Sequence, residues 1–237
     1  MKRGLDIIVS SAVLVAGLPL LLVMAVLIWL HDSRTPFYMA PRVGKEGRPF
    51  RMIKLRSMTV GSDRSGVTDT KADDPRITPI GHIVRRYKLD ELPQLWNVLR
   101  GEMSLVGPRP QVQHDVDRYS DEERRLLTVR PGMTDFASIV FADESELLRG
   151  SPDPASTTAR FIRPWKSRLG LFYIDHRTTL LDLQLMVLTG LALFARAPAL
   201  LLVSRILQTL GAEKALVEIA RRRTESIPLP PSGVTAT

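Results

Sequence analysis

The chain has 237 residues and no cysteine. This absence excludes a disulfide framework, a zinc site built on thiolates and a cysteine nucleophile. Histidine is scarce as well, with four residues scattered along the sequence, so a histidine-rich metal site is not expected. Any chemistry must therefore come from carboxylates, hydroxyls, lysine, arginine or a bound hard metal ion.

Acidic residues are outnumbered, since 25 Asp and Glu face 33 Lys and Arg and leave a formal charge of +8. A basic chain favours anionic partners such as phosphates, acidic lipids or nucleic acid. No motif that reads nucleic acid is present, so nucleic-acid binding is not expected. The mean hydropathy of +0.01 is that of an ordinary soluble protein. That average hides two strongly apolar ends.

The first apolar segment runs from Ile7 to Leu30 without a charge and is long enough to cross a hydrocarbon core of roughly 30 Å. No signal-peptide cleavage pattern follows it, which favours a permanent membrane element. Pro19 lies in its middle, so we expect a break or kink near residues 18–19. Each half is then too short to span alone.

The charges that flank this segment favour a helix that dips into one leaflet and returns. Lys2 and Arg3 hold the N-terminus on the cytoplasmic side, and the basic region from Arg34 prefers the same side. In such a re-entrant helix, backbone groups freed at the bend need partners, for which the hydroxyls of Ser10 and Ser11 are candidates. The alternative is an ordinary kinked helix that spans the membrane once.

The second apolar segment, residues 180–210, is interrupted by charges and by the Ala197-Pro198 pair. These interruptions make a membrane span improbable and favour amphipathic helices at the interface, with Arg196 and Arg205 at headgroup level. From about Arg221 the sequence becomes basic and then rich in Pro, Ser, Gly and Thr, which predicts a disordered tail.

The polar middle predicts an α-dominated α+β domain. Two short strands at 37–42 and 50–55 form a hairpin, 61–76 is a loop, and helical patterns follow at 81–87, 91–99 and 120–127. The predicted divisions are a re-entrant membrane helix, a cytosolic or interfacial catalytic domain, an amphipathic helical extension and a disordered tail, at 1–33, 34–190, 191–220 and 221–237.

Adjacent carboxylates at Asp90 and Glu91 precede an apolar-periodic helix with Pro93 in its first turn. One interpretation is structural, with Asp90 as the helix N-cap. The other is chemical: the positive helix end and the arginines at 85–86 would lower the pKa of Asp90 and keep it ionised, as a nucleophile or metal ligand must be. Such a pair also suits Mg²⁺ that bridges to substrate phosphates.

Two prolines fix the backbone on either side of Arg109, which suits an arginine that grips a phosphate with both terminal nitrogens. A rigid turn whose arginine pairs with a carboxylate explains the motif equally well. Lys54, Arg56 and Arg130 are further candidate phosphate contacts. Together with a membrane element, these residues favour phosphoryl chemistry on an amphiphile at a membrane surface.

At this point the sequence resembles the bacterial sugar transferases that are monotopic phosphoglycosyl transferases, over about residues 1–190. KRGLDIIVS and the Pro19 break are similar to the family's re-entrant helix, and FYMAPRVGKEGRPFRMIKLRSM to its R-x-G-x-x-G-x-x-F-x-x-x-K-x-R-[ST]-M segment. DDPRITPIGHIVRRYKLDELPQLWNVLRGEMSLVGPRP resembles the core signature. PGMTDFASIVFADESELL and YIDHRTTLLDLQLMVLT resemble later segments.

The resemblance implies a two-step reaction at the cytoplasmic face of the bacterial inner membrane. A UDP-sugar would give up its sugar phosphate to Asp90 and then to polyprenyl (undecaprenyl) phosphate, which would begin assembly of a surface glycan. Glu91 carries over as the partner of Asp90, either to hold Mg²⁺ together with Asp90 or to deprotonate the acceptor phosphate. Residues that carry over as substrate contacts are Lys54, Arg85, Arg109 and, more weakly, Asp182. The identity of the sugar and self-association as a homo-oligomer stay open.

The sequence departs from the family in two places. Asp135 stands in PGMTD where many members have Gly, so the substrate end of the site differs. The chain also continues for about 45 residues past the usual last segment. The competing hypothesis is a non-catalytic basic scaffold that binds anionic lipid for a glycan-assembly system. It predicts that Asp90 and Glu91 are dispensable.

Overall fold

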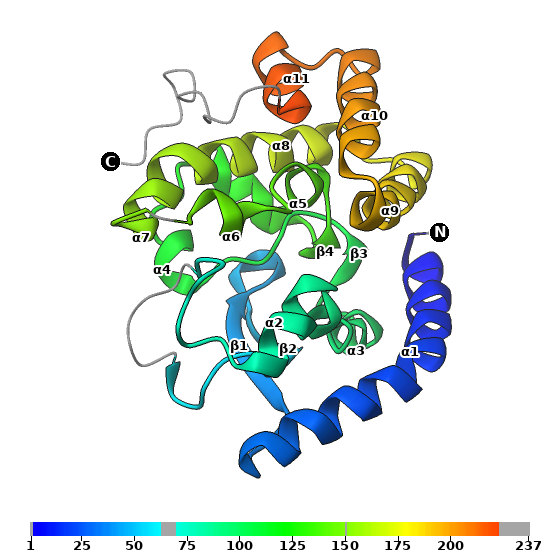
Figure 1. The fold of residues 1–237 in the computed structure, drawn as a ribbon. Helices are drawn as coiled ribbons and strands as arrows, with labels where there is room; N and C mark the ends of the chain where they lie inside the picture. The colour runs from blue at the N-terminus through cyan, green and yellow to red at the C-terminus, as the bar shows by residue number, and fades with distance from the viewer. Residues whose placement is uncertain (1, 63–69, 150, 223–237) are drawn as a thin grey trace.

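The computed structural model describes residues 2–62, 70–149 and 151–222 (Figure 1). Most of the predicted tail, residues 223–237, lies outside them, as does 63–69 in the predicted loop at 61–76. The helices are α1 (Lys2–Asp32), α2 (Pro79–Arg86), α3 (Gln94–Arg100), α4 (Gln113–Val116), α5 (Phe136–Val140), α6 (Glu144–Leu147), α7 (Pro154–Thr157), α8 (Arg163–His176), α9 (Thr179–Phe194), α10 (Arg196–Thr209) and α11 (Lys214–Arg221). The strands are β1 (Phe37–Val43), β2 (Pro49–Leu55), β3 (Ser104–Val106) and β4 (Gly132–Thr134).

Helix α1 runs along one edge of the molecule and changes direction part-way (Figure 1). Its hydrogen-bonded helix continues through Pro19, so the expected disruption is a bend within one helix and not a break. The predicted role of Ser10 is wrong, because its buried Oγ has no hydrogen-bond partner among the described residues. Within those residues, α1 is the one helix long and apolar enough to cross a membrane.

Both ends of α1 are fastened to the same globular domain. At the start, the Nζ of Lys2 donates to Asp182 of α9 at 2.6 Å. The buried Asp6 accepts hydrogen bonds from two residues of β3, the hydroxyl of Ser104 and the backbone N–H of Leu105. At the end, Arg56 donates two hydrogen bonds to the carboxylate of Asp32, at 2.6 and 2.7 Å. Between them, Gly17 lies against Leu92 at the entrance to α3.

The predicted hairpin is confirmed. Strands β1 and β2 pair antiparallel in the register Phe37 with Leu55 and Val43 with Pro49, and a 3-10 turn at Lys45–Gly47 joins them. A second, parallel pair of strands, β3 and β4, was not predicted from the sequence. Each has three residues, too few for a period-2 pattern to stand out. The α-dominated α+β class is confirmed within the described residues.

The predicted helices are confirmed in part. The first corresponds to α2, whose N-cap Thr78 accepts from the backbone of Gly81. The third, at 120–127, is a 3-10 helix, η4 (Glu123–Thr128), which a capping box between Ser120 and Glu123 begins. The second begins later than expected, as described with the site.

Helices α9, α10 and α11 pack beside α5 and α8 (Figure 1). Their buried leucines belong to the main hydrophobic core, which also contains Phe136 of α5 and Trp165 of α8. Asp143, after α5, forms ion pairs with Arg196 at 2.8 Å and with Arg222 at 3.1 Å. The core is therefore continuous across the predicted boundary at residue 190. Residues on α9 remain exposed on the outer side, among them Leu180, Val187 and Phe194.

Candidate functional site

The Asp90-Glu91 pair lies in a tight 3-10 turn, η3 (Leu89–Glu91), between α2 and α3. Lys88, just before it, has a left-handed backbone with φ of +56°, a conformation that costs a side-chain-bearing residue roughly 1 kcal/mol. Helix α3 begins only at Gln94, with Pro93 as its N-cap. The interpretation of Asp90 as a helix cap is therefore wrong, and its carboxylate is left for other contacts.

Glu91 is held by Arg109 through two hydrogen bonds. Nη1 donates to Oε2 and Nη2 to Oε1, both at 2.9 Å, and Nη1 also donates to the carbonyl of Met133 at 2.6 Å. The rigid turn with a carboxylate partner, one of the two interpretations of the Pro-Arg-Pro motif, is thus confirmed. The Arg109 side chain as a whole keeps 26% of its surface exposed.

A close approach of two backbones places Arg109. Strand β3 leads through Gly107 and Pro108 to this arginine, and β4 runs beside it in parallel. A Cβ on Gly132 would lie 2.1 Å from the backbone nitrogen of Gly107, which no real Cβ contact allows. Glycine is therefore required where the strands meet, and the meeting holds the Met133 carbonyl within reach of the guanidinium.

Lys54 reaches the same point from β2. Its Nζ lies 3.7 Å from Oδ2 of Asp90, and both side chains are largely buried. The side chain of Asn97 on α3 ties that helix to the strand, because it accepts from the backbone of Ile53 at 2.9 Å and donates to the carbonyl of Arg51 at 2.8 Å. This amide clamp fixes Lys54 beside the carboxylate.

The two carboxylates have opposite electrostatic environments. Burial raises the pKa of Asp90 above its ordinary value, and the positive charge of Lys54 opposes that rise. Burial also disfavours the ionised form of Glu91, but Arg109 and Lys54 outweigh it and lower its pKa to about 2. The predicted lowering of the Asp90 pKa by a helix end is therefore wrong, because the residue is buried and starts no helix.

Two more arginines interact electrostatically with the charged residues of this site. Arg85, predicted as a phosphate contact, is partly buried at the end of α2, and burial lowers its pKa while Asp90 raises it. Burial lowers the pKa of Arg42 on β1, and the charge of Arg109 adds to that lowering. Arg42 in turn lowers the pKa of Lys54. It was not predicted as a site residue, although it is the first residue of the R-x-G-x-x-G pattern.

Asp135 is fully buried beside the same cluster. Its Oδ1 caps α5 by accepting from the backbone and hydroxyl of Ser138, both at 2.7 Å. Burial raises its pKa, and Arg109 acts against that rise. The departure from the family pattern at this position therefore adds a carboxyl group close to the arginine that holds Glu91.

The other predicted contacts lie elsewhere. Arg56 is engaged with Asp32 at the end of α1. Arg130 donates through Nε to the carbonyl of Gly101 at 2.9 Å. Asp182 accepts from Lys2 and from the hydroxyl of Tyr173, both at 2.6 Å. The structure thus brings Lys54, Arg85, Asp90, Glu91 and Arg109 together and places these three apart.

The carboxylate oxygens of Asp90 and Glu91 are the ligands available for the predicted Mg²⁺. Among the described residues no group of three or more His, Cys, Asp or Glu side chains gathers as a protein-only metal cage. Mg²⁺ is usually held by one or two carboxylates, waters and substrate phosphates, so a full cage is not required. Asp90 can supply an oxygen, and Glu91 keeps lone pairs after accepting two hydrogen bonds. The site is compatible with a metal that substrate completes.

The sequence is similar to those of known proteins. Residues 1–196 match the sequence model of a family described as bacterial sugar transferase. The chain is 40% identical over 141 residues to a UDP-glucose:undecaprenyl-phosphate glucose-1-phosphate transferase of Caulobacter vibrioides, which covers 58% of this chain and 53% of that protein.

In two further relatives, the matched region is about a third of the relative's own length. A UDP-galactose-lipid carrier transferase of Erwinia amylovora is 40% identical over 149 residues, or 56% of this chain and 31% of the relative. A UDP-N-acetylgalactosamine-undecaprenyl-phosphate N-acetylgalactosaminephosphotransferase of Aeromonas hydrophila is 39% identical over 142 residues, or 59% and 34%. The match therefore spans between about a third and a half of these curated relatives.

Proposed function

Because the chain belongs to the bacterial sugar transferase family, we propose that it transfers a sugar-1-phosphate from a UDP-sugar to polyprenyl phosphate, with Asp90 as the nucleophile. The three relatives described above are named for sugar-phosphate transfer or for lipid-carrier transfer. The observation that supports the assignment to Asp90 is its position, buried within 3.7 Å of the ammonium of Lys54 and next to a carboxylate fixed by Arg109.

In the first step an oxygen of Asp90 attacks the β-phosphorus of the UDP-sugar. The bond between that phosphorus and the bridging oxygen breaks, and the electron pair leaves with UMP. The product is an acyl phosphate that joins Asp90 to the sugar phosphate. In the second step an oxygen of polyprenyl phosphate attacks the same phosphorus, the bond to Asp90 breaks, and the carboxylate is restored as the polyprenyl diphosphate sugar leaves.

The charged residues around Asp90 have different roles in the proposed reaction. Lys54 favours the ionised form of Asp90, which is the form that attacks. Arg109, together with Arg85 and Arg42, provides the positive charge that a diphosphate needs in a partly buried site. Glu91 stays ionised and fixes the guanidinium in one orientation, so little order is lost when substrate binds.

Asp90 and Glu91 are the residues that would hold Mg²⁺. The ion, when bound, would neutralise negative charge on the diphosphate. This part of the proposal is tested directly by the dependence of UMP release on added Mg²⁺ and by its loss with a chelator.

The attachment of α1 supports a seat on one face of the membrane. Lys2 and Asp32, at the two ends of the apolar helix, are both bonded to the same domain. In a straight span, one of these residues would lie on the far side of the bilayer, about 30 Å from the other residue. A bent helix that enters and leaves the same leaflet keeps both contacts, and the positive charge near both ends favours the cytoplasmic face of the inner membrane. There the chain would begin assembly of a surface glycan.

The decisive experiment follows UMP release from a panel of UDP-sugars with undecaprenyl phosphate and Mg²⁺. We expect one or a few sugars to support turnover, and Asp90→Asn to lower it at least about a thousandfold, because the amide is a poor nucleophile. The wild-type enzyme should carry radioactivity from a labelled sugar phosphate when acceptor is omitted, and the variant should not. Full activity of Asp90→Asn would refute Asp90 as the nucleophile, and absence of turnover with every UDP-sugar would favour the scaffold hypothesis.

A further inference from the structure

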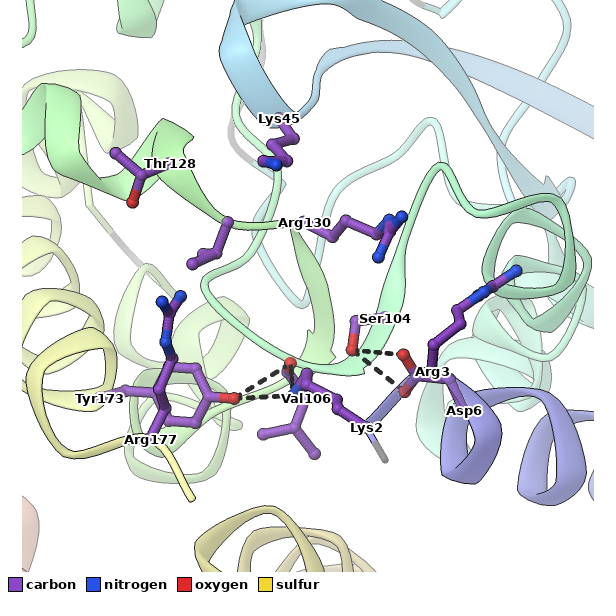
Figure 2. Close-up of a pocket in the computed structure, with 11 residues that line it drawn as sticks. Lys2, Arg3, Asp6, Lys45, Ser104, Val106, Thr128, Arg130, Tyr173 and Arg177 are labelled. Atoms are coloured by element: carbon purple, nitrogen blue, oxygen red, sulfur yellow. Dashed lines mark hydrogen bonds between the residues drawn. The ribbon is translucent and has the colours of Figure 1, made fainter. Parts of the chain in front are cut away.

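A second cationic site lies at the start of α1. A cavity of about 270 Å³ is lined by residues from several segments, among them Lys2, Arg3, Lys45, Thr128, Arg130 and Arg177. Figure 2 shows that Lys45, Arg130 and Arg177 surround the same opening from different segments of the chain. Lys54, Asp90, Glu91 and Arg109 do not line it, so it is separate from the proposed catalytic turn.

The cavity has a surplus of positive charge. Lys2 is neutralised by Asp182 and Lys45 by Glu46. The guanidinium of Arg3 instead donates to the carbonyls of Val98 and Leu99, at 2.6 and 2.8 Å, and so keeps its charge.

Arg130 also keeps its charge, because its partner is the carbonyl of Gly101. Arg177 forms no ion pair with a described carboxylate. The cavity's one acidic lining residue, Asp6, accepts hydrogen bonds from the hydroxyl of Ser104 and the backbone of Leu105. Three uncompensated arginines thus face one carboxylate that already has donors.

Hydrogen-bond donors remain available for an anion. Within the described ranges, the terminal nitrogens of Arg130 and the whole guanidinium of Arg177 donate to no other residue. An anion of phosphate size fits the volume, which Arg130 and Arg177 line from different segments of the chain. The positive end of the α1 helix dipole lies at the same cavity and adds to the attraction.

The two helices that Lys2 joins at the cavity, α1 and α9, carry exposed apolar residues. Ile8 on α1 is 71% exposed, and Leu180 and Leu183, which flank the Asp182 bonded to Lys2, are exposed on α9. This combination suits a ligand with a negative head and an apolar tail. If α1 enters the membrane as in the proposed function, on which this inference rests, the cavity at its start lies at the depth of the lipid headgroups.

We propose that this cavity binds the phosphate headgroup of an anionic phospholipid, and that the bound lipid fastens the start of α1 to the domain. The headgroup would lie in the cavity that Arg130 and Arg177 line, and the acyl chains would lie along the exposed apolar residues of α1 and α9. The site is a structural lipid site beside the catalytic one. Its occupation would stabilise the fold without taking part in sugar transfer.

The test titrates the full chain, in neutral detergent, with short-chain phosphatidylglycerol and follows the thermal unfolding midpoint. Parallel titrations use phosphatidylcholine of the same chain length and inorganic phosphate. We expect phosphatidylglycerol to raise the midpoint in a saturable way, because a ligand that binds only the folded state stabilises it. Phosphatidylcholine and free phosphate should have little effect at the same concentrations.

The test variant replaces Arg130 and Arg177 with glutamine, and the matched control makes the same change at Arg124 and Arg149, two exposed arginines away from the cavity. The test variant should bind phosphatidylglycerol about tenfold more weakly, and the control should bind like the wild type. An equal loss in both pairs, or no loss in the test variant, would overturn the site. An equal response to free phosphate would overturn the lipid as its ligand.

This measurement does not depend on sugar transfer. A saturable lipid response in a chain that turns over no UDP-sugar would keep the lipid site and reject the proposed activity. Turnover without any specific lipid response would reject the lipid site alone.

Discussion

Arg109 binds Glu91 with two hydrogen bonds of equal length, 2.9 Å, while the adjacent Asp90 has its nearest cation, Lys54, 3.7 Å away. Two neighbouring carboxylates therefore differ in freedom and in charge. The pKa of Glu91 is lowered to about 2, and that of Asp90 is raised by burial. Such a separation is typical of paired acids with different catalytic roles. It supports the proposed roles, in which Glu91 is the fixed anion and Asp90 the reacting group.

The pair between Arg109 and Glu91 predicts strong coupling in a double-mutant cycle. Arg109→Met and Glu91→Gln should each lower the free energy of unfolding by about 1–3 kcal/mol, because each leaves a partly buried partner without its ion. The double variant should lose less than the sum, with a coupling energy of about 1–2 kcal/mol. Urea unfolding in detergent measures all three. Additive losses would show that the two residues act independently.

The same pair contributes to acid sensitivity. Glu91 has a lower pKa in the folded state than its ordinary value of 4.5, so its stabilising effect is complete above about pH 4.5 and is lost as the pH falls toward 2. Glu91→Gln should therefore flatten the dependence of unfolding free energy on pH in that window.

The charge of Lys54 should set the pH at which the acidic limb of the kcat/KM profile lies. Only ionised Asp90 attacks, so kcat/KM should rise with pH through its raised pKa. Lys54→Met removes the main charge that opposes burial, which raises the pKa of Asp90 further and should move the limb to higher pH. Lys214→Gln, a change at an exposed lysine on α11, should leave the limb in place. A lower kcat/KM with an unmoved limb would mean that Lys54 acts only on substrate.

Local sequence patterns were sufficient for the hairpin and for α2, where turn glycines and a capping threonine act over a few residues. The carboxylate pair, Lys54, Arg85 and Arg109 were also found from the sequence, because their spacing in the motifs is distinctive. Their gathering around one turn is confirmed by the structure. Whether they perform the predicted chemistry remains a prediction.

What the sequence could not provide were contacts between distant segments. Strands β3 and β4 are short and pair across 28 residues, so neither gives a periodic signal. Arg56 and Asp182 are charged residues in family motifs, yet their partners are Asp32 and Lys2, at the two ends of α1. The pKa of Asp90 was predicted in the wrong direction because burial, which decides it, depends on the whole fold.

Asp182 provides a test between a substrate contact and a structural anchor. It is buried and accepts from Lys2 and from Tyr173, whose hydroxyl also reaches the Val106 carbonyl at 3.3 Å. Asp182→Asn should lower the free energy of unfolding by about 1–3 kcal/mol and leave the KM for UDP-sugar within about twofold of wild type. Tyr173→Phe should cost about 1 kcal/mol with the same unchanged KM. A raised KM at unchanged stability would restore Asp182 as a substrate contact.

The attachment of both ends of α1 to one domain predicts that both face the same aqueous compartment. Gly4→Cys and Arg34→Cys, made singly, introduce the chain's sole thiol near each end, since no native cysteine competes. A Cβ at Gly4 meets no atom within 4 Å, and Lys2 and Asp32 keep their bonds. In spheroplasts, a membrane-impermeant maleimide should label neither thiol until the membrane is permeabilised, and then both. If one thiol is labelled in intact spheroplasts and the other only after permeabilisation, α1 spans the bilayer, and the contact of Lys2 with Asp182 or of Asp32 with Arg56 cannot exist in the membrane-bound protein.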